Sequence, residues 1–412
     1  DAHRADRRLE AGELGIDDIH RLATTVAAFH ARARCDDETG RYGQVDAIRK
    51  NVRENFAQTR STIEGYLSPE ECQEVEAWQL EVLGETARFD ARIAAQRVRD
   101  GHGDLRLEHV YFQPDGSLAI IDCIEFNERF RFADVCADIA FLSMDLAWHG
   151  RADLAEHFLA RYAHETDDYD LYSVVNFYES YRAFVRGKVA LLLARDTAAS
   201  DASRERARRE ARRYFLLSLA FERPPLEPPR LVAVGGMIAS GKSTVAAYAG
   251  SLLAAPVLSS DRTRKHMAGA RPTDSIESEA WSGNYADSAT QRVYAELCRR
   301  AEVILESGRP VVVDASFRSQ GLRATIRAVA ERQGVPFVFI EASAPRDIRR
   351  TRLLARDRGG THESDARADL LDTFAAHYEP VDPSEAETLL RVDTSHPQSD
   401  TQRRIQAAVT SD

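Results

Sequence analysis

The most informative segment of the sequence reads Leu231-Val-Ala-Val-Gly-Gly-Met-Ile-Ala-Ser-Gly-Lys-Ser-Thr244. Its apolar start predicts a buried parallel strand, and the Ala-rich stretch from Val245 to Ala255 predicts a helix directly after the loop. Between them, Gly236 is followed after four residues by Gly241-Lys-Ser. This is the spacing of a phosphate-binding loop, in the strand–loop–helix context that the motif requires.

Each part of this loop has a predicted chemical task. Glycines allow backbone N–H groups to point at phosphate oxygens, and the helix N-terminus adds a partial positive charge. Lys242 is predicted to reach the β- and γ-phosphates of a nucleoside triphosphate, and the Ser243 hydroxyl to ligate Mg²⁺. The residues predicted to bind ATP are Gly236, Met237, Ile238, Ala239, Ser240, Gly241, Lys242, Ser243 and Thr244. The alternative is a glycine-rich turn with a chance lysine.

The composition places the chain among soluble globular proteins. Its 412 residues, 43% hydrophobic and 29% charged, predict two or three domains. No apolar run is long enough to span a membrane, and the charged start is not a signal peptide. Five scattered cysteines indicate free thiols in a reducing compartment, so we expect a cytoplasmic protein. The net charge of −11 argues against a broad nucleic-acid surface and leaves the oligomeric state open.

A proline-dense stretch divides the chain. Residues 223–230, Arg-Pro-Pro-Leu-Glu-Pro-Pro-Arg, predict a stiff linker between a domain over 1–222 and a domain over 231–412. After the linker, strands are predicted over 231–235, 256–259, 310–314, 336–342 and 388–392. Helices are predicted between them, among others over 287–306, 319–333 and 346–356. This alternation indicates an α/β domain with a parallel sheet covered on both faces.

The N-terminal domain is predicted to be mainly helical with one short β-hairpin. Helices are predicted over 7–34, 44–66, 69–98, 133–148, 152–165, 169–196 and 203–221. The hairpin turns at Pro114-Asp-Gly116, and an aspartate lies near the far end of each arm, Asp104 and Asp122. The histidines on the opening helix, His20 and His30, are interpreted as packing or solvated residues.

The two arms of this hairpin carry a family resemblance. His102-Gly-Asp104-Leu-Arg-Leu-Glu-His109, followed by Ile121-Asp122, resembles the catalytic loop and metal-binding aspartate of the aminoglycoside phosphotransferase-like family, which has a kinase-like fold. The resemblance extends from the first helices to about Ala220. It implies that Asp104 is the catalytic aspartate, that Asp122 binds Mg²⁺, and that Asp138 supports the catalytic loop. Such a pair of acids suits phosphoryl transfer to an alcohol.

Two features depart from that family. The fifth residue after its catalytic aspartate is usually asparagine, whereas here it is His109, and imidazole suits Mg²⁺ poorly. No glycine-rich loop or Ala-x-Lys strand precedes the hairpin, so we expect the larger lobe of the kinase-like fold with its small lobe absent. The first residue is not methionine, and we expect that an N-terminal portion is missing. The alternative reading is a hairpin whose acids cap loops.

Further candidate residues follow the phosphate-binding loop. The second predicted strand ends before Asp261, and Arg264 comes three residues later. Because ligands bind at the carboxyl ends of parallel strands, Asp261 is predicted to orient or deprotonate an acceptor hydroxyl, and Arg264 to hold an anionic group of the acceptor. The alternative is that Asp261 caps the next helix. Asp314, which ends another apolar strand, is predicted to contact the acceptor or water bound to Mg²⁺.

An arginine-rich helix comes later in the chain. Arg352 and Arg356, with Arg358 behind them, are predicted to form a lid that neutralises charge on the transferred phosphoryl group. The alternative is a solvated basic helix face.

Residues 231 to about 393 resemble the P-loop kinase group that includes polynucleotide kinase, zeta-toxin and gluconate kinase relatives. The resemblance rests on the loop, on Asp261, Arg264 and Asp314, on the arginine lid, and on Gly283-Asn-Tyr285 before a long helix. The order of the two domains resembles bifunctional aminoglycoside phosphotransferase/ATP-binding proteins of the AAA type.

The resemblance implies an ATP- and Mg²⁺-dependent kinase that acts through the C-terminal domain on a hydroxyl of a small molecule or polynucleotide end. Two alternatives stay open: phosphotransfer by the N-terminal domain, and an ATP-binding switch without transfer.

Overall fold

The computed structural model describes residues 3–221, 228–271, 274, 287–359, 369, 371–396 and 398–410, with the backbone alone at 356–359 and 398. The chain divides into two compact units, Asp1–Pro225 and Leu226–Asp412. The division falls inside the proline-dense stretch. Within the described ranges, no helix combines the length and the apolar character needed to cross a membrane.

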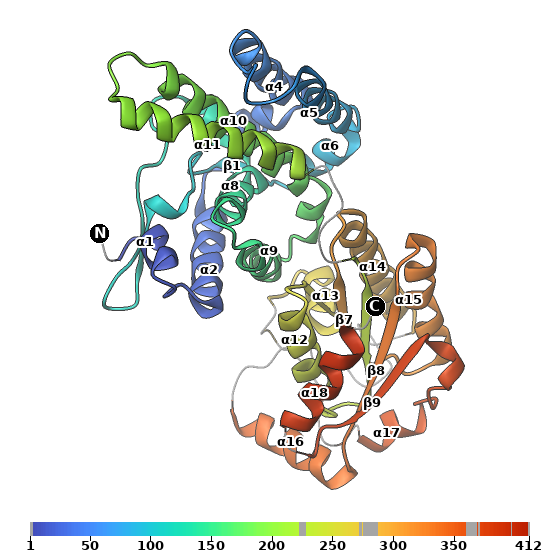
Figure 1. Ribbon diagram of the computed structural model, residues 1–412. Helices are drawn as coiled ribbons and strands as arrows, with labels where there is room; N and C mark the ends of the chain where they lie inside the picture. The colour runs from blue at the N-terminus through green and yellow to red at the C-terminus, as the bar shows by residue number, and fades with distance from the viewer. Residues whose placement is uncertain are drawn as a thin grey trace. The chain divides into compact units, whose positions relative to one another are not determined.

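The N-terminal unit is built mainly from helices (Figure 1). They are α1 (Ala5–Glu10), α2 (Ile16–Arg32), α3 (Asp37–Gly40), α4 (Val45–Thr59), α5 (Pro69–Val82), α6 (Thr86–Ala94), α7 (Glu128–Arg131), α8 (Val135–Trp148), α9 (Ala152–Thr166), α10 (Val175–Arg195) and α11 (Asp201–Ala220). The core forms around α8, which is buried from Val135 to Leu146 and packs against α9 and α10. A helix that is apolar all round is expected at such a central position.

Two pairs of short strands complete this unit. The predicted hairpin is present: β2 (Val110–Phe112) pairs antiparallel with β3 (Leu118–Ile120). A second antiparallel pair, β1 (Val98–Asp100) with β4 (Phe132–Asp134), was not predicted.

Two long helices predicted in this unit are wrong in extent. The helix over 69–98 is divided into α5 and α6, and the left-handed backbone of Gln96 (φ 57°) separates α6 from β1. The helix over 7–34 is likewise divided into α1 and α2. Gly12 adopts a left-handed conformation (φ 72°) and Gly15 precedes the first turn of α2. Gln96 after α6 and Gly12 after α1 are thus left-handed residues that end a helical hydrogen-bond ladder.

The C-terminal unit contains a five-stranded parallel sheet in its described part, with strand order β6-β7-β5-β8-β9. The strands are β5 (Leu231–Gly235), β6 (Val257–Ser259), β7 (Val311–Asp314), β8 (Phe337–Ser343) and β9 (Thr388–Asp393). The helices are α12 (Lys242–Leu252), α13 (Ser260–Met267), α14 (Asp287–Glu306), α15 (Gln320–Gln333), α16 (Arg346–Gly359), α17 (Leu371–Ala376) and α18 (Gln398–Val409). The predicted alternation of strands and helices is confirmed.

Helices cover both faces of this sheet (Figure 1). On one face, Val232 and Val234 of β5 pack with residues of α12 and α18. On the other face, α14 and α15 contact β7 and β8. Every residue of β5 is buried, which explains its continuous apolar sequence. After β5 the chain passes to β6 and β7, which lie on one side of β5, and then to β8 and β9, which lie on its other side. Ligands of open α/β sheets bind at the carboxyl ends of the strands, where the strand order switches in this way.

Candidate functional site

The phosphate-binding loop joins β5 to α12 and contains a strained backbone. Gly236 and Gly241 have positive φ angles of 143° and 86°, which favour glycine. A Cβ atom on Gly236 would lie 2.2 Å from the carbonyl oxygen of Ala342, so no side chain fits there. Ala239 has a φ of 56°, a conformation uncommon for a residue with a Cβ atom. The loop is therefore curled tightly against the end of β8.

Helix α12 begins within the motif itself. Its first residue is Lys242, and Gly241 is its N-cap. The first N–H groups of a helix have no acceptor inside the helix, and the helix dipole adds a partial positive charge at the same end. Lys242 is half-buried, whereas Ser243 and Thr244 are exposed. These residues fit an anion-binding cradle for the phosphates of a nucleotide.

Two acidic residues, Asp314 and Asp261, lie at the same end of the sheet as the loop, where the strands have their carboxyl ends. Asp314 of β7 is opposite Val234 of β5 on one side and Ser259 of β6 on the other. Its side chain is buried, and it ends its strand beside the loop. Asp261 lies in the first turn of α13, which starts directly after β6, and its side chain is half-buried.

The cap of α13 is Ser259, whose Oγ accepts a hydrogen bond from the Arg262 N–H at 3.4 Å. The alternative in which Asp261 caps this helix is therefore wrong. Arg264 is buried and follows Asp261 by three positions, so the two share one face of α13. The structure thus brings Asp261, Arg264 and Asp314 to the end of the sheet that carries the loop. The segment Gly283-Asn-Tyr285 lies outside the described residues.

The first arginine of the predicted lid contacts the loop backbone. The Arg352 guanidinium in α16 donates to the carbonyl oxygen of Ala239 at 3.1 Å and to Oγ1 and the carbonyl oxygen of Thr394 at 2.9 and 2.8 Å. Thr394 follows β9, and its hydroxyl lies 2.6 Å from the carbonyl oxygen of Ser240. The side chains of Arg356 and Arg358 lie outside the described part, so a role for them in a lid stays a prediction.

A second group of contacts holds the loop that follows Asp314. The Tyr294 hydroxyl accepts a hydrogen bond from the Phe317 N–H at 2.9 Å and lies 3.4 Å from Ser316 Oγ. The Ser316 carbonyl oxygen accepts a hydrogen bond from the Gly236 N–H at 3.2 Å. Burial raises the pKa of Tyr294, so its hydroxyl keeps its proton. Tyr294 and Thr394 were not predicted, because their roles depend on contacts between distant segments.

In the N-terminal unit, Asp138 supports the predicted catalytic loop. Its two carboxylate oxygens accept hydrogen bonds from the N–H groups of His102 and Gly103 at 2.6 and 2.8 Å. His30 lies 3.3 Å away through Nε2 and also contacts Tyr162. Burial alone would raise the Asp138 pKa, but the hydrogen bond to His30 and nearby positive charge lower it to about 2. His30 is thus buried and hydrogen-bonded, in agreement with its interpretation as a packing residue.

The predicted catalytic aspartate is engaged by a neighbour. Arg106 donates two hydrogen bonds of 3.0 Å to the Asp104 carboxylate. Burial raises the pKa of Asp104, but the bonds and charge of Arg106 outweigh that effect and lower it. His109 Nδ1 lies 2.8 Å from the Asp104 carbonyl oxygen, and His109 Nε2 lies 3.4 Å from the carboxylate of the exposed Asp122. Across the described residues, no three or more His, Cys, Asp or Glu side chains are grouped to hold a metal ion.

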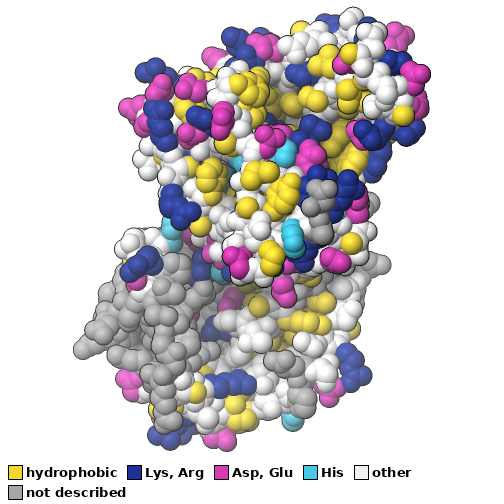
Figure 2. Space-filling model, turned by 90° about the vertical axis from the view of Figure 1, so that its left-hand side faces the viewer, with side chains coloured by type: hydrophobic (Ala, Val, Ile, Leu, Met, Phe, Trp, Pro, Cys, Tyr) yellow, Lys and Arg dark blue, Asp and Glu magenta, His cyan; other side chains and the backbone are white. Residues whose placement is uncertain are grey.

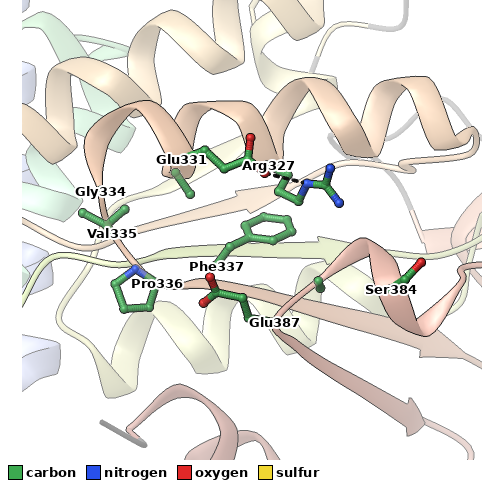
Figure 3. Close-up of a pocket in the computed structure, with 10 residues that line it drawn as sticks. Arg327, Glu331, Gly334, Val335, Pro336, Phe337, Ser384 and Glu387 are labelled. Carbon is green, nitrogen blue, oxygen red and sulfur yellow. Dashed lines mark ion pairs between the residues drawn. The ribbon is translucent and has the colours of Figure 1, made fainter.

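A groove of about 650 Å³ lies at the amino-terminal ends of strands β8 and β9, at the end of the C-terminal sheet opposite to the phosphate-binding loop (Figure 3). Pro336 and Phe337, at the start of β8, form its floor. Arg327 and Glu331 of α15 form an ion pair of 3.0 Å beside it, and Glu387 lies across from them. Because none of its lining residues belongs to the phosphate-binding loop, this groove is separate from the candidate site.

The surface of the N-terminal unit carries charges of both signs. Figure 2 shows one face, on which acidic and basic side chains are interspersed with apolar ones. On α11, Arg208 forms an ion pair of 2.9 Å with Glu205. Arginines of α11 are therefore partly balanced by acids on the same helix.

A family model from known proteins matches most of the C-terminal unit. Residues 231–381 match the family model described as an AAA domain. Together with the loop geometry, this match identifies the C-terminal unit as a P-loop domain.

Two curated relatives cover most of the chain. It is 32% identical over 380 residues to the uncharacterized protein Rv2004c of Mycobacterium tuberculosis, and the match covers 91% of this chain and 72% of that protein. The same values hold for the uncharacterized protein Mb2027c of Mycobacterium bovis. The chain belongs to the family of these mycobacterial proteins.

The solved structures that match part of the chain include three kinases. A sugar kinase from Janibacter sp. HTCC2649 is 18% identical, with 44% of this chain and 95% of that chain covered and a TM-score of 0.35. A gluconokinase from Sinorhizobium meliloti 1021 is 23% identical, with 44% and 91% covered and a TM-score of 0.31. The Mycobacterium tuberculosis APS kinase CysC is 21% identical, with 46% and 100% covered and a TM-score of 0.33. At these TM-scores, the three structures carry no argument about this chain.

Proposed function

We propose that the protein is an ATP- and Mg²⁺-dependent phosphotransferase of the cytoplasm, whose C-terminal unit transfers the γ-phosphoryl group of ATP to a hydroxyl group. The acceptor is a small molecule or a polynucleotide end. One observation carries this proposal: the phosphate-binding loop with its left-handed glycines lies at the carboxyl ends of the strands, as do Asp261 and Asp314. A cradle for phosphate and a carboxylate for the acceptor are the two parts that phosphoryl transfer needs.

The proposed roles follow from position. Lys242 and the loop N–H groups hold the phosphates, and Ser243 holds Mg²⁺, which when bound neutralises charge on the β- and γ-phosphates. Asp261 orients the acceptor hydroxyl and accepts its proton. Arg264, on the same helix face, holds an anionic group of the acceptor. Asp314 contacts the acceptor or water on Mg²⁺.

A second candidate is phosphotransfer by the N-terminal unit, as the larger lobe of an aminoglycoside phosphotransferase-like fold. It is favoured by Asp138, which holds the loop of His102 and Gly103 through two hydrogen bonds. The Arg106–Asp104 ion pair disfavours it, because a general base needs a carboxylate that is open to the substrate. A third candidate, an ATP-dependent switch without transfer, differs in having little turnover.

The test follows the γ-phosphoryl group of labelled ATP into a metabolite extract and into a pool of hydroxyl-ended oligonucleotides, with Mg²⁺ present. The wild type is compared with Lys242→Ala, Asp261→Asn and Asp104→Asn. Label transfer that is lost in the first two variants and kept in the third is the expected result. The labelled species then identifies the acceptor.

The other outcomes separate the candidates. Transfer lost only in Asp104→Asn would assign the reaction to the N-terminal unit. Tight, Lys242-dependent ATP binding with no labelled acceptor would favour the switch. An ATP affinity unchanged by Lys242→Ala would reject nucleotide binding by the loop.

A further inference from the structure

Two consecutive carbonyl groups of the phosphate-binding loop are held by side chains from distant parts of the chain. Arg352 of α16 donates to the Ala239 carbonyl oxygen at 3.1 Å, across 113 positions of sequence. The Thr394 hydroxyl lies 2.6 Å from the Ser240 carbonyl oxygen, across 154 positions. We call this pair, Arg352 and Thr394, the loop bracket.

The direction of each bond in the loop bracket is fixed by chemistry. A guanidinium has donors and no acceptor, so Arg352 must donate to Thr394 Oγ1 across their distance of 2.9 Å. The Thr394 hydroxyl therefore donates its single proton to the Ser240 carbonyl oxygen at 2.6 Å, in preference to the Ser343 carbonyl oxygen at 3.2 Å. Arg352 also donates to the Thr394 carbonyl oxygen at 2.8 Å, so two hydrogen bonds join the two residues of the loop bracket.

The bracket sets the direction of a loop amide. The C=O and N–H of a trans peptide point in opposite directions. Because the Ser240 carbonyl points at Thr394, the N–H of Gly241 in the same peptide points away from the bracket. Gly241 is the N-cap of α12, where N–H groups of phosphate-binding loops meet the anion.

The bracket also packs directly against the loop. A Cβ atom on Gly241 would lie 2.9 Å from Thr394 Oγ1. Ala239, whose carbonyl Arg352 holds, has the uncommon φ of 56°. A residue persists in such a conformation only where its surroundings hold it. The bracket therefore contacts the loop at two of its three left-handed positions, Ala239 and Gly241.

We infer that Arg352 and Thr394 are positioning residues that orient the Gly241 N–H of the loop toward nucleotide phosphates, so that Arg352 acts through the loop rather than on the transferred phosphoryl group. This inference rests on the proposed nucleotide binding by the loop. The bracket ties two later segments, α16 and the turn after β9, to the loop. Nucleotide affinity consequently depends on a hydroxyl group that need not touch the nucleotide.

The test measures the affinity of the full chain for a fluorescent ADP analogue with Mg²⁺, together with the thermal stability of the ligand-free protein. Thr394→Val keeps the shape of the side chain but removes the hydroxyl, and Thr394→Ser restores it. We expect about a tenfold loss of affinity in Thr394→Val, recovery in Thr394→Ser, and a loss in Arg352→Gln. The matched controls are Thr325→Val, whose hydroxyl only bonds its own helix, and Arg350→Gln on the exposed face of α16.

Each outcome decides a separate point. Wild-type affinity in both Thr394→Val and Arg352→Gln would overturn the inference while leaving nucleotide binding intact. A loss of affinity that Thr394→Ser fails to recover, or that follows the stability of the ligand-free protein, would reduce the bracket to a structural role. If Thr394→Val does not fold, Arg352→Gln and Thr394→Ser supply the comparison. Binding by the wild type that Lys242→Ala leaves unchanged would reject the proposed function itself.

Discussion

Replacing Asp138 by asparagine tests how the predicted catalytic loop of the N-terminal unit is held. The carboxylate is buried and accepts hydrogen bonds from two consecutive N–H groups, those of His102 and Gly103. Asparagine has nearly the same shape but a single acceptor oxygen and no charge. One of the two N–H groups will therefore face an NH₂ group, in a position that water does not reach.

The magnitude follows from the pKa of the carboxyl group. The Asp138 pKa falls from its ordinary 3.8 to about 2 on folding. At about 1.4 kcal/mol for each pKa unit, the ionised carboxylate contributes about 2–3 kcal/mol to the free energy of unfolding. Because the folded pKa is the lower one, this contribution is complete above pH 5 and is lost as the pH falls from about 4 to about 2. About half of it should be gone at pH 3. The unpaired N–H group adds about 1–3 kcal/mol to the cost of the substitution.

The assay is urea unfolding of the full chain followed by tryptophan fluorescence. The chain has three tryptophans, of which Trp78 and Trp148 belong to the N-terminal unit. A Trp281→Phe background removes the third, so that the fluorescence reports on the unit that contains Asp138. The control is Asp90→Asn, an exposed carboxyl of the same unit.

We expect Asp138→Asn to lower the free energy of unfolding by about 3–5 kcal/mol at pH 7. The difference from the wild type should shrink between pH 5 and pH 3, while the control differs little at any pH. A loss below about 1 kcal/mol, or a difference that does not change with pH, would refute the idea that an ionised Asp138 holds the loop.

Three further substitutions have defined outcomes. Gly236→Ala places a Cβ atom 2.2 Å from the Ala342 carbonyl oxygen, so fluorescent ADP titration should show affinity reduced more than about tenfold, and unchanged affinity would contradict the loop geometry. Arg92→Met leaves the buried Asp134 carboxylate without its cation and leaves the buried Asp168 with Arg97 at 3.5 Å, so it should cost about 3–5 kcal/mol in urea unfolding; a neutral effect would count against the buried pairs. Tyr294→Phe leaves the buried Phe317 N–H without its acceptor and should cost about 1–3 kcal/mol by thermal unfolding, with no loss expected if water replaces the hydroxyl.

The C-terminal unit could be predicted closely because its sequence pattern is strong. Each strand predicted there overlaps a strand of the structure, and the helix predicted over 287–306 matches α14 in its bounds. Strands buried on both faces, such as β5, have continuous apolar sequences that glycine and proline interrupt at their ends. The N-terminal helices were also found, but their ends were less accurate. A left-handed residue such as Gln96 can end a helix without a sequence mark.

The contacts that hold the candidate site could not be predicted in the same way. The β1–β4 pair consists of strands of three residues each, too short for a pattern to appear. Thr394 and Tyr294 are ordinary residues of a turn and a helix when only the neighbouring sequence is considered. Their roles arise from hydrogen bonds to segments far away in the chain, such as the bond from Thr394 to Ser240. A single sequence does not encode such pairs in any local pattern.

The two units differ in how their predicted catalytic groups are engaged, and this difference bears on the proposed assignment of phosphoryl transfer to the C-terminal unit. In the N-terminal unit, Arg106 donates two hydrogen bonds to the Asp104 carboxylate, and a substrate hydroxyl would have to displace them. In the C-terminal unit, the loop bracket engages two carbonyl groups of the phosphate-binding loop, those of Ala239 and Ser240. The contact on the Ser240 carbonyl group leaves the N–H of Gly241 directed away from the bracket, because the C=O and N–H of a trans peptide point in opposite directions. The C-terminal loop is thus organised for an anion before one binds, whereas Asp104 would have to exchange its partner first.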